Sequence, residues 1–135
     1  KGISVTMQDN PYYDDVCEEV FSYLQSRADE ALAAGVSKDK ILLDPGIGFG
    51  KRLEDNLQLL ANLEQLCAKP YPVLLGTSRK RFLSAICQQD DASRLGVATS
   101  ATTALAVQAG VRIVRVHDVI ENRQAADVAW AIHSA

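Results

Sequence analysis

Three polar clusters follow short apolar runs, and their side chains suit a polar, partly anionic ligand. The clusters are residues 44–51 (DPGIGFGK), 77–80 (TSRK) and 115–119 (RVHDV). They contain carboxylates, hydroxyls, cations and an imidazole, which can hold the N–H groups of a heterocycle or bind a carboxylate or phosphate. In α/β proteins such groups gather where parallel strands end. We therefore expect an enzyme site, or most of one, at one edge of a sheet.

The first cluster is a glycine-rich loop after the run ILL. Asp44 either accepts hydrogen bonds from the amino and ring N–H groups of a heterocycle or caps the following turn, and the sequence favours neither interpretation. The three glycines of the loop allow close approach of a ligand or of backbone, in a spacing that is neither a dinucleotide fingerprint nor a Walker loop. Phe49 either closes over a planar ligand or anchors the loop.

The other two clusters combine cations with a hydroxyl or an imidazole. Ser78 precedes two cations at the predicted start of a helix, which indicates either an anion site or a solvated basic turn. Alternation along a strand puts Arg115 and His117 on one side and Val116 on the other. Arg115 suits bidentate phosphate contact, and its pairing with His117 favours a functional role for that histidine.

The elements that position these clusters can be read from the apolar pattern. Unbroken Val/Ile/Leu runs predict parallel strands, buried on both faces, at residues 41–43, 73–75 and 112–116. Helical spacing predicts helices at residues 11–34, around 57–67 with Leu57, Leu60, Leu63 and Cys67 on one face, at 81–87, from Ser93 as N-cap to Ala109, and at 121–133. Gly110 is predicted to close the fourth helix in a left-handed conformation.

This order predicts an α/β fold of about three and a half βα units in one domain, residues 1–135. An open three-stranded parallel sheet would leave two unpaired edges, and a closed eight-unit barrel typically needs roughly 250 residues. We therefore predict the C-terminal part of a TIM (β/α)8 barrel. Trp130 is predicted to pack at the barrel wall or at a subunit interface, and His133 to lie on the surface.

Composition excludes several classes of protein. The 135 residues are 47% hydrophobic and 23% charged, as in globular domains, and the net charge of -3 gives no reason to expect a nucleic-acid partner. No apolar stretch approaches the roughly 20 residues that a membrane span needs, so we expect a cytoplasmic protein without a membrane partner. Cys17, Cys67 and Cys87 are far apart in sequence, which predicts buried free thiols.

Taken together, the motifs resemble the dihydropteroate synthase family along almost the whole chain. The resemblance rests on Thr6-Met7-Gln8, AGVSKDKILLDPGIGFGK, GTSRKRF, Arg94-Leu95-Gly96 and IVRVHDV, in that order and spacing. The family belongs to folate biosynthesis, joins a dihydropterin pyrophosphate to para-aminobenzoate and releases pyrophosphate. The resemblance implies a (β/α)8 barrel whose last three strands lie in this chain.

The resemblance also implies roles for particular residues. Pterin would be bound by Asp44, Gly48, Lys80 and Arg115, pyrophosphate by Arg115, Val116 and His117, and aminobenzoate by Phe49, Ser78, Arg79, Lys80 and Arg81. Lys80, Arg115 and His117 would be catalytic, and no residue here would bind a metal. Mg²⁺ would be held through the pyrophosphate and the N-terminal half of the barrel. The chain alone would then be incomplete and inactive, while the full-length enzyme would be a homodimer and a sulfonamide target.

Two other functions share parts of this pattern. A pterin-binding methyltetrahydrofolate methyltransferase has a similar barrel, but methyl transfer gives no pyrophosphate for residues such as Arg115 and His117 to bind. A non-catalytic barrel relative would keep the fold without the site residues, which are all present here. A barrel for a phosphorylated sugar is disfavoured because Asp44 is placed for nitrogen donors.

Overall fold

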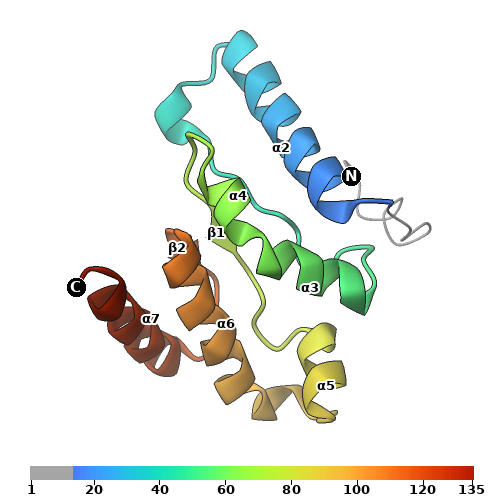
Figure 1. Ribbon diagram of the computed structural model, residues 1–135, viewed down its shortest axis with the longest axis vertical. Helices are drawn as coiled ribbons and strands as arrows, with labels where there is room; N and C mark the ends of the chain where they lie inside the picture. The colour runs from blue at the N-terminus through green and yellow to red at the C-terminus, as the bar shows by residue number, and fades with distance from the viewer. Residues whose placement is uncertain (1–13) are drawn as a thin grey trace.

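The computed structural model describes residues 14–135, so Thr6-Met7-Gln8 lies outside the described residues (Figure 1). The elements are α2 (Val16–Ala33), α3 (Leu53–Ala61), α4 (Leu63–Cys67), β1 (Leu74–Leu75), α5 (Arg81–Cys87), α6 (Gly96–Ala109), β2 (Ile113–Val114) and α7 (Val119–His133), with 3-10 turns η1 (Lys38–Lys40) and η2 (Ala92–Arg94). Helices separate the strands along the chain, as the sequence predicts. The described part of the chain is therefore α/β.

The strands are parallel and lie in the order of the sequence. Leu74 of β1 pairs with Ile113 of β2, and a parallel bridge joins Leu43 to Val73 on the other side of β1. The N–H of Leu74 donates to the carbonyl of Leu43 at 2.8 Å. Two of the three predicted strands are present as β1 and β2, over fewer residues than predicted, and the first is reduced to the bridge at Leu43. Their carboxyl ends lie at the same edge, which places the three polar clusters there.

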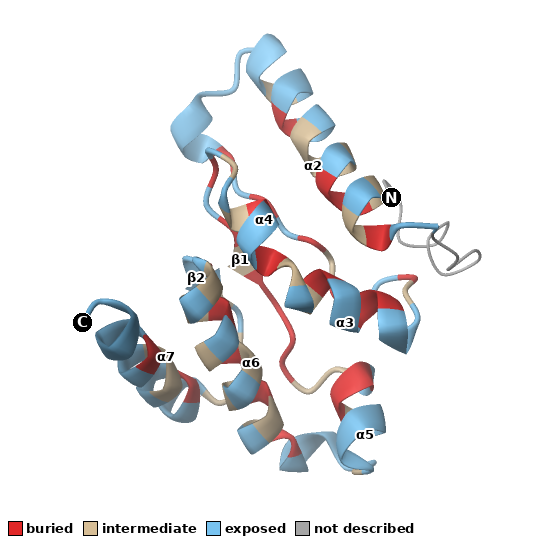
Figure 2. Cartoon of the chain, in the orientation of Figure 1, coloured by how far each residue is buried: buried red, intermediate tan, exposed pale blue. Residues whose placement is uncertain are grey.

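The core lies between these strands and the helices. Leu43, Val73 and Leu75 are each at most 3% exposed, whereas Leu42 is 50% and Ile113 is 42% exposed. Figure 2 shows the buried residues along the sides of the helices and strands that face one another. The prediction that the strands are buried on both faces is wrong for the described chain, because Leu42 and Ile113 are exposed.

The helices pack against their sequence neighbours. Asp15 caps α2 by accepting the Glu18 N–H at 3.1 Å, and Val16, Val20, Phe21 and Ala28 form its buried face. The helix α2 contacts α3, α4 contacts α6, and α6 contacts α7, while α5 contacts α3 and α6. In Figure 1 α2, α4, α6 and α7 follow one another, and α5 lies to the side of α6. Their order in space is that of successive βα units.

The predicted helix around residues 57–67 is two helices. Asn62 separates α3 from α4, and its Nδ2 donates to the Gln58 carbonyl at 2.8 Å, which competes with the helical bonds. Leu59, Leu63 and Leu66 are buried, whereas Leu57 is exposed. Leu60, Leu63 and Cys67 of the predicted face do pack on the core, and only Leu57 was wrong.

Ser93 does not cap α6, which begins at Gly96. Instead, Asp91 accepts hydrogen bonds from both the N–H and the hydroxyl of Ser93 and so starts η2. Gly110 does close α6 in a left-handed conformation, with φ +109, as predicted.

The exposure of Trp130, His133 and the three cysteines differs in part from the predictions. Trp130 is 60% exposed and stacks on His133, so it does not pack into a barrel wall, and His133 is exposed as predicted. All three cysteines are free. However, Cys87 is exposed and the other two are only partly buried.

Candidate functional site

Side chains hold the glycine-rich loop by bonding to its backbone. Asp44 ends the first strand and its Oδ1 accepts the Gly46 N–H at 2.8 Å. The Nζ of Lys51 donates to the carbonyls of Gly46 and Phe49 at 2.8 and 3.0 Å. Asp44 therefore caps the turn, which was one of its two predicted roles, and it is exposed.

Lys80 crosses from the end of β1 to this loop. Its Nζ donates to the Ile47 carbonyl at 2.6 Å and lies 4.9 Å from the centroid of the Phe49 ring. Gly48 has φ +92, and a Cβ there would lie 3.3 Å from Cδ of Lys80. Gly48 is thus required both by its backbone conformation and by the close approach of Lys80.

The charges on Asp44 and Arg115 influence the pKa of Lys80. Burial lowers the pKa of Lys80, the Asp44 carboxylate acts to raise that pKa, and the Arg115 guanidinium acts to lower it further. Asp44 and Arg115 directly follow paired strand residues, and Lys80 follows β1. Because the paired segments are parallel, the three groups lie at the same edge of the sheet.

Lys51 was not predicted as a functional residue. Burial lowers its pKa to about 8, opposed by Asp44 and reinforced by Lys80. The sequence shows Lys51 directly after the third glycine of the loop. It could not predict that the Lys51 ammonium group folds back to bond the carbonyls of the loop.

A cavity of about 620 Å³ opens beside the loop. It is lined by Ile47, Gly48, Phe49, Gly50, Lys51, Lys80 and Arg81. Four of the predicted ligand contacts, namely Gly48, Phe49, Lys80 and Arg81, are thus brought together. Ser78 and Arg79 are not among the lining residues.

Ser78 is bonded to His117 instead. Its Oγ lies 2.6 Å from Nδ1 of His117 and accepts the backbone N–H of the same residue at 3.0 Å. Ser78 is 9% exposed, whereas His117 is exposed and Val116 is half-buried. The buried hydroxyl therefore fixes the orientation of an exposed imidazole.

Arg79 points to Asp118. Its guanidinium donates to Oδ1 of Asp118 at 3.3 Å, and its backbone has φ +56, which is unusual for a residue with a side chain. Nε of Arg79 and Oδ2 of Asp118 are buried without a hydrogen-bond partner among residues 14–135. The ion pair lies on the His117 side of the site rather than in the cavity.

Gly76 is a second residue that sequence reasoning missed. A Cβ at Gly76 would lie 2.7 Å from a terminal nitrogen of Arg115, so the guanidinium group lies directly over the end of β1. The sequence does show a glycine immediately after the strand residues VLL. Its role could not be predicted, because it depends on contact with Arg115, which is 39 positions later in the chain.

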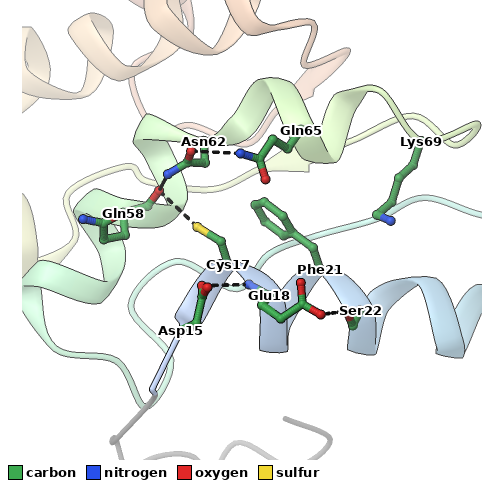
Figure 3. Close-up of a pocket in the computed structure, with 9 residues that line it drawn as sticks. All are labelled: Asp15, Cys17, Glu18, Phe21, Ser22, Gln58, Asn62, Gln65 and Lys69. Atoms are coloured by element: carbon green, nitrogen blue, oxygen red, sulfur yellow. Dashed lines mark hydrogen bonds between the residues drawn. The ribbon is translucent and has the colours of Figure 1, made fainter.

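A separate pocket of about 430 Å³ lies between α2 and the helices α3 and α4. Figure 3 shows that its polar side chains largely bond to local partners: Cys17 donates to the Gln58 carbonyl, Asn62 bonds Gln65, and Glu18 bonds Ser22. Burial, reinforced by Asp15, raises the pKa of the Cys17 thiol, which disfavours the reactive thiolate. None of the predicted ligand contacts lines this pocket.

Residues 14–135 contain neither a metal-ligand cluster nor a membrane-spanning helix. No group of three or more His, Cys, Asp or Glu side chains is placed to hold a metal ion within that range. Nor is any helix in it long and apolar enough to cross a membrane.

The chain matches the family described as pterin binding enzyme over residues 1–117. That match covers most of the chain, which therefore belongs to the pterin-binding enzyme family.

Within this family the chain is similar to dihydropteroate synthases. It is 45% identical to that of Haemophilus influenzae over 119 residues, which cover 88% of this chain and 43% of the relative. A Thermus thermophilus dihydropteroate synthase in complex with 4-aminobenzoate has a TM-score of 0.88 at 42% identity, covering 94% of this chain and 49% of the relative. A second structure of that enzyme, in complex with 6HMPPP, has a TM-score of 0.90 at 41% identity, covering 97% and 51%.

These similarities confirm the predicted family resemblance and the fold class, α/β and part of a TIM barrel. The chain spans less than half the length of the H. influenzae relative and about half of each T. thermophilus structure.

Proposed function

We propose that the whole protein, meaning this chain with whatever precedes or follows it, is a dihydropteroate synthase. It would join dihydropterin pyrophosphate to para-aminobenzoate and release pyrophosphate. The observation that carries the proposal is the position of Lys80, which contacts the glycine-rich loop and is within electrostatic reach of both Asp44 and Arg115. The similarity to dihydropteroate synthases, one of them in complex with 4-aminobenzoate, supports it.

The pterin would bind at the ends of the first two strands. The exposed carboxylate of Asp44 bonds one backbone N–H, and a carboxylate has about four acceptor positions, so it can still accept the amino and ring N–H groups of a pterin. Lys80 would donate to the pterin carbonyl and a ring nitrogen. Gly48 would allow the ring close to the backbone, and Arg115 would stack on its face.

The aminobenzoate would occupy the cavity beside Phe49. Lys80 lies over the Phe49 ring, and Arg81 lines the same cavity with an exposed side chain that can reach a carboxylate. Ser78 and Arg79, for which the sequence predicted contacts here, are bonded to His117 and Asp118. We therefore assign them a positioning role for the pyrophosphate side of the site.

The chemistry would depend on charge rather than on a covalent nucleophile. The bond between the pterin methylene carbon and the pyrophosphate oxygen breaks, and the oxygen keeps the electron pair. Arg115 and His117, with the Val116 backbone beside them, would stabilise the negative charge that develops on pyrophosphate. The methylene cation is then attacked by the arylamine nitrogen, which forms the new C–N bond and loses a proton.

Magnesium is implied by the family resemblance, but the described residues do not form a site for it. No cluster of three candidate ligands occurs in residues 14–135, and His117 is bonded to Ser78. We derive no step through a metal. Our proposal keeps Mg²⁺ as an ion that the whole protein would hold through the pyrophosphate oxygens and residues outside the described range.

Incorporation of radiolabelled para-aminobenzoate into dihydropteroate by the purified whole protein tests the proposal. We expect incorporation that depends on dihydropterin pyrophosphate, with release of one pyrophosphate per product. If the whole protein binds dihydropterin pyrophosphate but forms no product, the synthase assignment is wrong. If calorimetry shows no binding either, the non-catalytic alternative holds.

We also propose that the protein is a single-domain, cytoplasmic homodimer and a sulfonamide target. The described residues share one hydrophobic cluster, which supports a single domain over residues 1–135. Leu105 on α6 and Trp130 on α7 are 70% and 60% exposed, which supports a homodimer that covers them. Free cysteines support a cytoplasmic location. Binding of aminobenzoate beside Phe49 would make the protein a sulfonamide target, which competition against aminobenzoate tests.

A further inference from the structure

A buried asparagine on α3 holds the middle of the glycine-rich loop. Asn56 is 2% exposed, and its Oδ1 accepts the N–H of Gly48 at 2.8 Å. Its own backbone N–H bonds the carbonyl of Arg52, so the first turn of α3 fixes where the side chain points. The family resemblance gave no role to Asn56, and it does not line the cavity.

The bond to Asn56 stabilises the backbone conformation of Gly48, which as a glycine would otherwise be flexible. Gly48 has φ +92, and glycine pays the largest entropic cost when it is fixed in one conformation. Lys51 bonds the carbonyls on either side, those of Gly46 and Phe49, but no part of Lys51 holds Gly48 itself. Asn56 therefore holds the N–H end of the peptide between Ile47 and Gly48, and Lys80 bonds its carbonyl end.

That peptide lies at the centre of the proposed site. The Ile47 carbonyl accepts the bond from Lys80, and the residue after Gly48 is Phe49, over whose ring the same ammonium lies. A rotation of this peptide would move the carbonyl away from Lys80 and shift Phe49 within the cavity. Asn56, which lies outside the cavity, thus helps to position both groups through its bond to Gly48.

We propose that Asn56 is a positioning residue that sets the affinity for aminobenzoate by holding the Gly48 N–H, and hence Lys80 and Phe49. This inference rests on the proposed function. It predicts that loss of the Asn56 acceptor weakens binding of aminobenzoate without removing any group that reacts. The effect should therefore appear mainly in KM for aminobenzoate, with kcat changed much less.

Steady-state kinetics of the whole protein with Asn56→Leu and Asn56→Asp test this. Leu has a similar volume but no acceptor, whereas Asp keeps an oxygen acceptor in the same place. We expect Asn56→Leu to raise KM for aminobenzoate by about tenfold, the effect of a lost buried hydrogen bond, with kcat within about threefold of wild type. Asn56→Asp should restore KM to within about threefold of wild type.

Leu59→Ala serves as the control for loss of stability. Leu59 lies on the same helix, is fully buried in the core, and does not line the cavity. It should lower the melting temperature at least as much as Asn56→Leu while leaving KM for aminobenzoate unchanged. If Leu59→Ala raises KM equally, or if Asn56→Leu leaves KM unchanged, Asn56 is merely structural and the proposal is wrong.

Hydrogen exchange of the Gly48 amide provides a readout that does not need activity. Exchange should be at least tenfold faster in Asn56→Leu than in wild type and close to wild type in Asn56→Asp. Unchanged exchange in Asn56→Leu overturns the positioning role even if the protein is an active synthase. If the whole protein makes no dihydropteroate, the proposed function fails, and the exchange measurement still decides whether Asn56 holds the loop.

Discussion

The two sides of the site are held in different ways. On the loop side, side chains from other positions bond the backbone of the loop: Asn56 holds Gly48, and Lys80 holds Ile47. On the strand side, side chains hold one another: Ser78 bonds His117, and Arg79 bonds Asp118. The loop side should therefore be sensitive to backbone changes, and the strand side to changes in side-chain charge and orientation.

Lys80 is the residue that connects the two sides, so its loss should have the largest effect. Lys80→Ala removes the bond to Ile47 and a positive charge that interacts with both Asp44 and Arg115. We expect kcat/KM for incorporation of aminobenzoate to fall by about 10²–10³, as when one electrostatic donor is removed from an active site.

Lys69→Ala is the matched control, because Lys69 lines the pocket between α2 and α3–α4 rather than the cavity. It should keep activity within about twofold of wild type. If kcat/KM falls equally in Lys80→Ala and Lys69→Ala, Lys80 does not contribute specifically to the site.

A methyl group at Gly48 should show that the loop depends on its backbone. Gly48→Ala forces a side chain into φ +92 and places its Cβ 3.3 Å from Lys80 Cδ. We expect affinity for both substrates to fall by about 10- to 100-fold, since such strain costs of order 1–3 kcal/mol. Calorimetry with dihydropterin pyrophosphate and with aminobenzoate would measure these affinities. Unchanged affinities would show that the loop is not part of the binding site.

The corresponding change on the strand side should be milder and more selective. Gly76 does not have a positive φ, so Gly76→Ala strains no backbone but displaces the end of the flexible Arg115 side chain. We expect affinity for dihydropterin pyrophosphate to fall by about three- to tenfold, as for loss of one hydrogen bond. Affinity for aminobenzoate should stay the same, and a larger loss there would show that the two sides do not act separately.

The smallest effect concerns the charge on Lys51. Burial lowers its pKa to about 8, from 10.5 for the unperturbed group. Between these pH values the unfolded chain binds more protons than the native protein, so the native state gains stability as pH rises. Below about pH 8 the ammonium is charged in both states, so the native protein is destabilised by the full free energy of burying that charge.

Urea unfolding of the whole protein and of Lys51→Met at several pH values would measure this. The free energy of unfolding of wild type relative to Lys51→Met should rise by about 1–2 kcal/mol from pH 7 to pH 10.5, after allowance for solvent screening. A flat difference would show that the Lys51 ammonium is not desolvated.

Much of this molecule can be predicted from residue types and spacing. Buried Val/Ile/Leu runs indicated parallel strands, and the polar residues after them indicated the edge where Asp44, Lys80 and Arg115 converge. The break at Asn62 could not be predicted, because it arises from a side chain that bonds the preceding turn. The same holds for Ser78 and Arg79, whose partners come from residues 39 positions later. Long-range pairing, rather than local propensity, decides which polar residues line the cavity.

A crystal structure of the whole protein with dihydropterin pyrophosphate and an aminobenzoate analogue tests the convergence of the three charged groups most directly. We predict one continuous ligand site in which Asp44 accepts the pterin N–H groups, Lys80 lies between the pterin and Phe49, and Arg115 contacts the pyrophosphate. A pterin bound in the pocket between α2 and α3–α4, or one that leaves Asp44 or Arg115 without contact, would contradict the account.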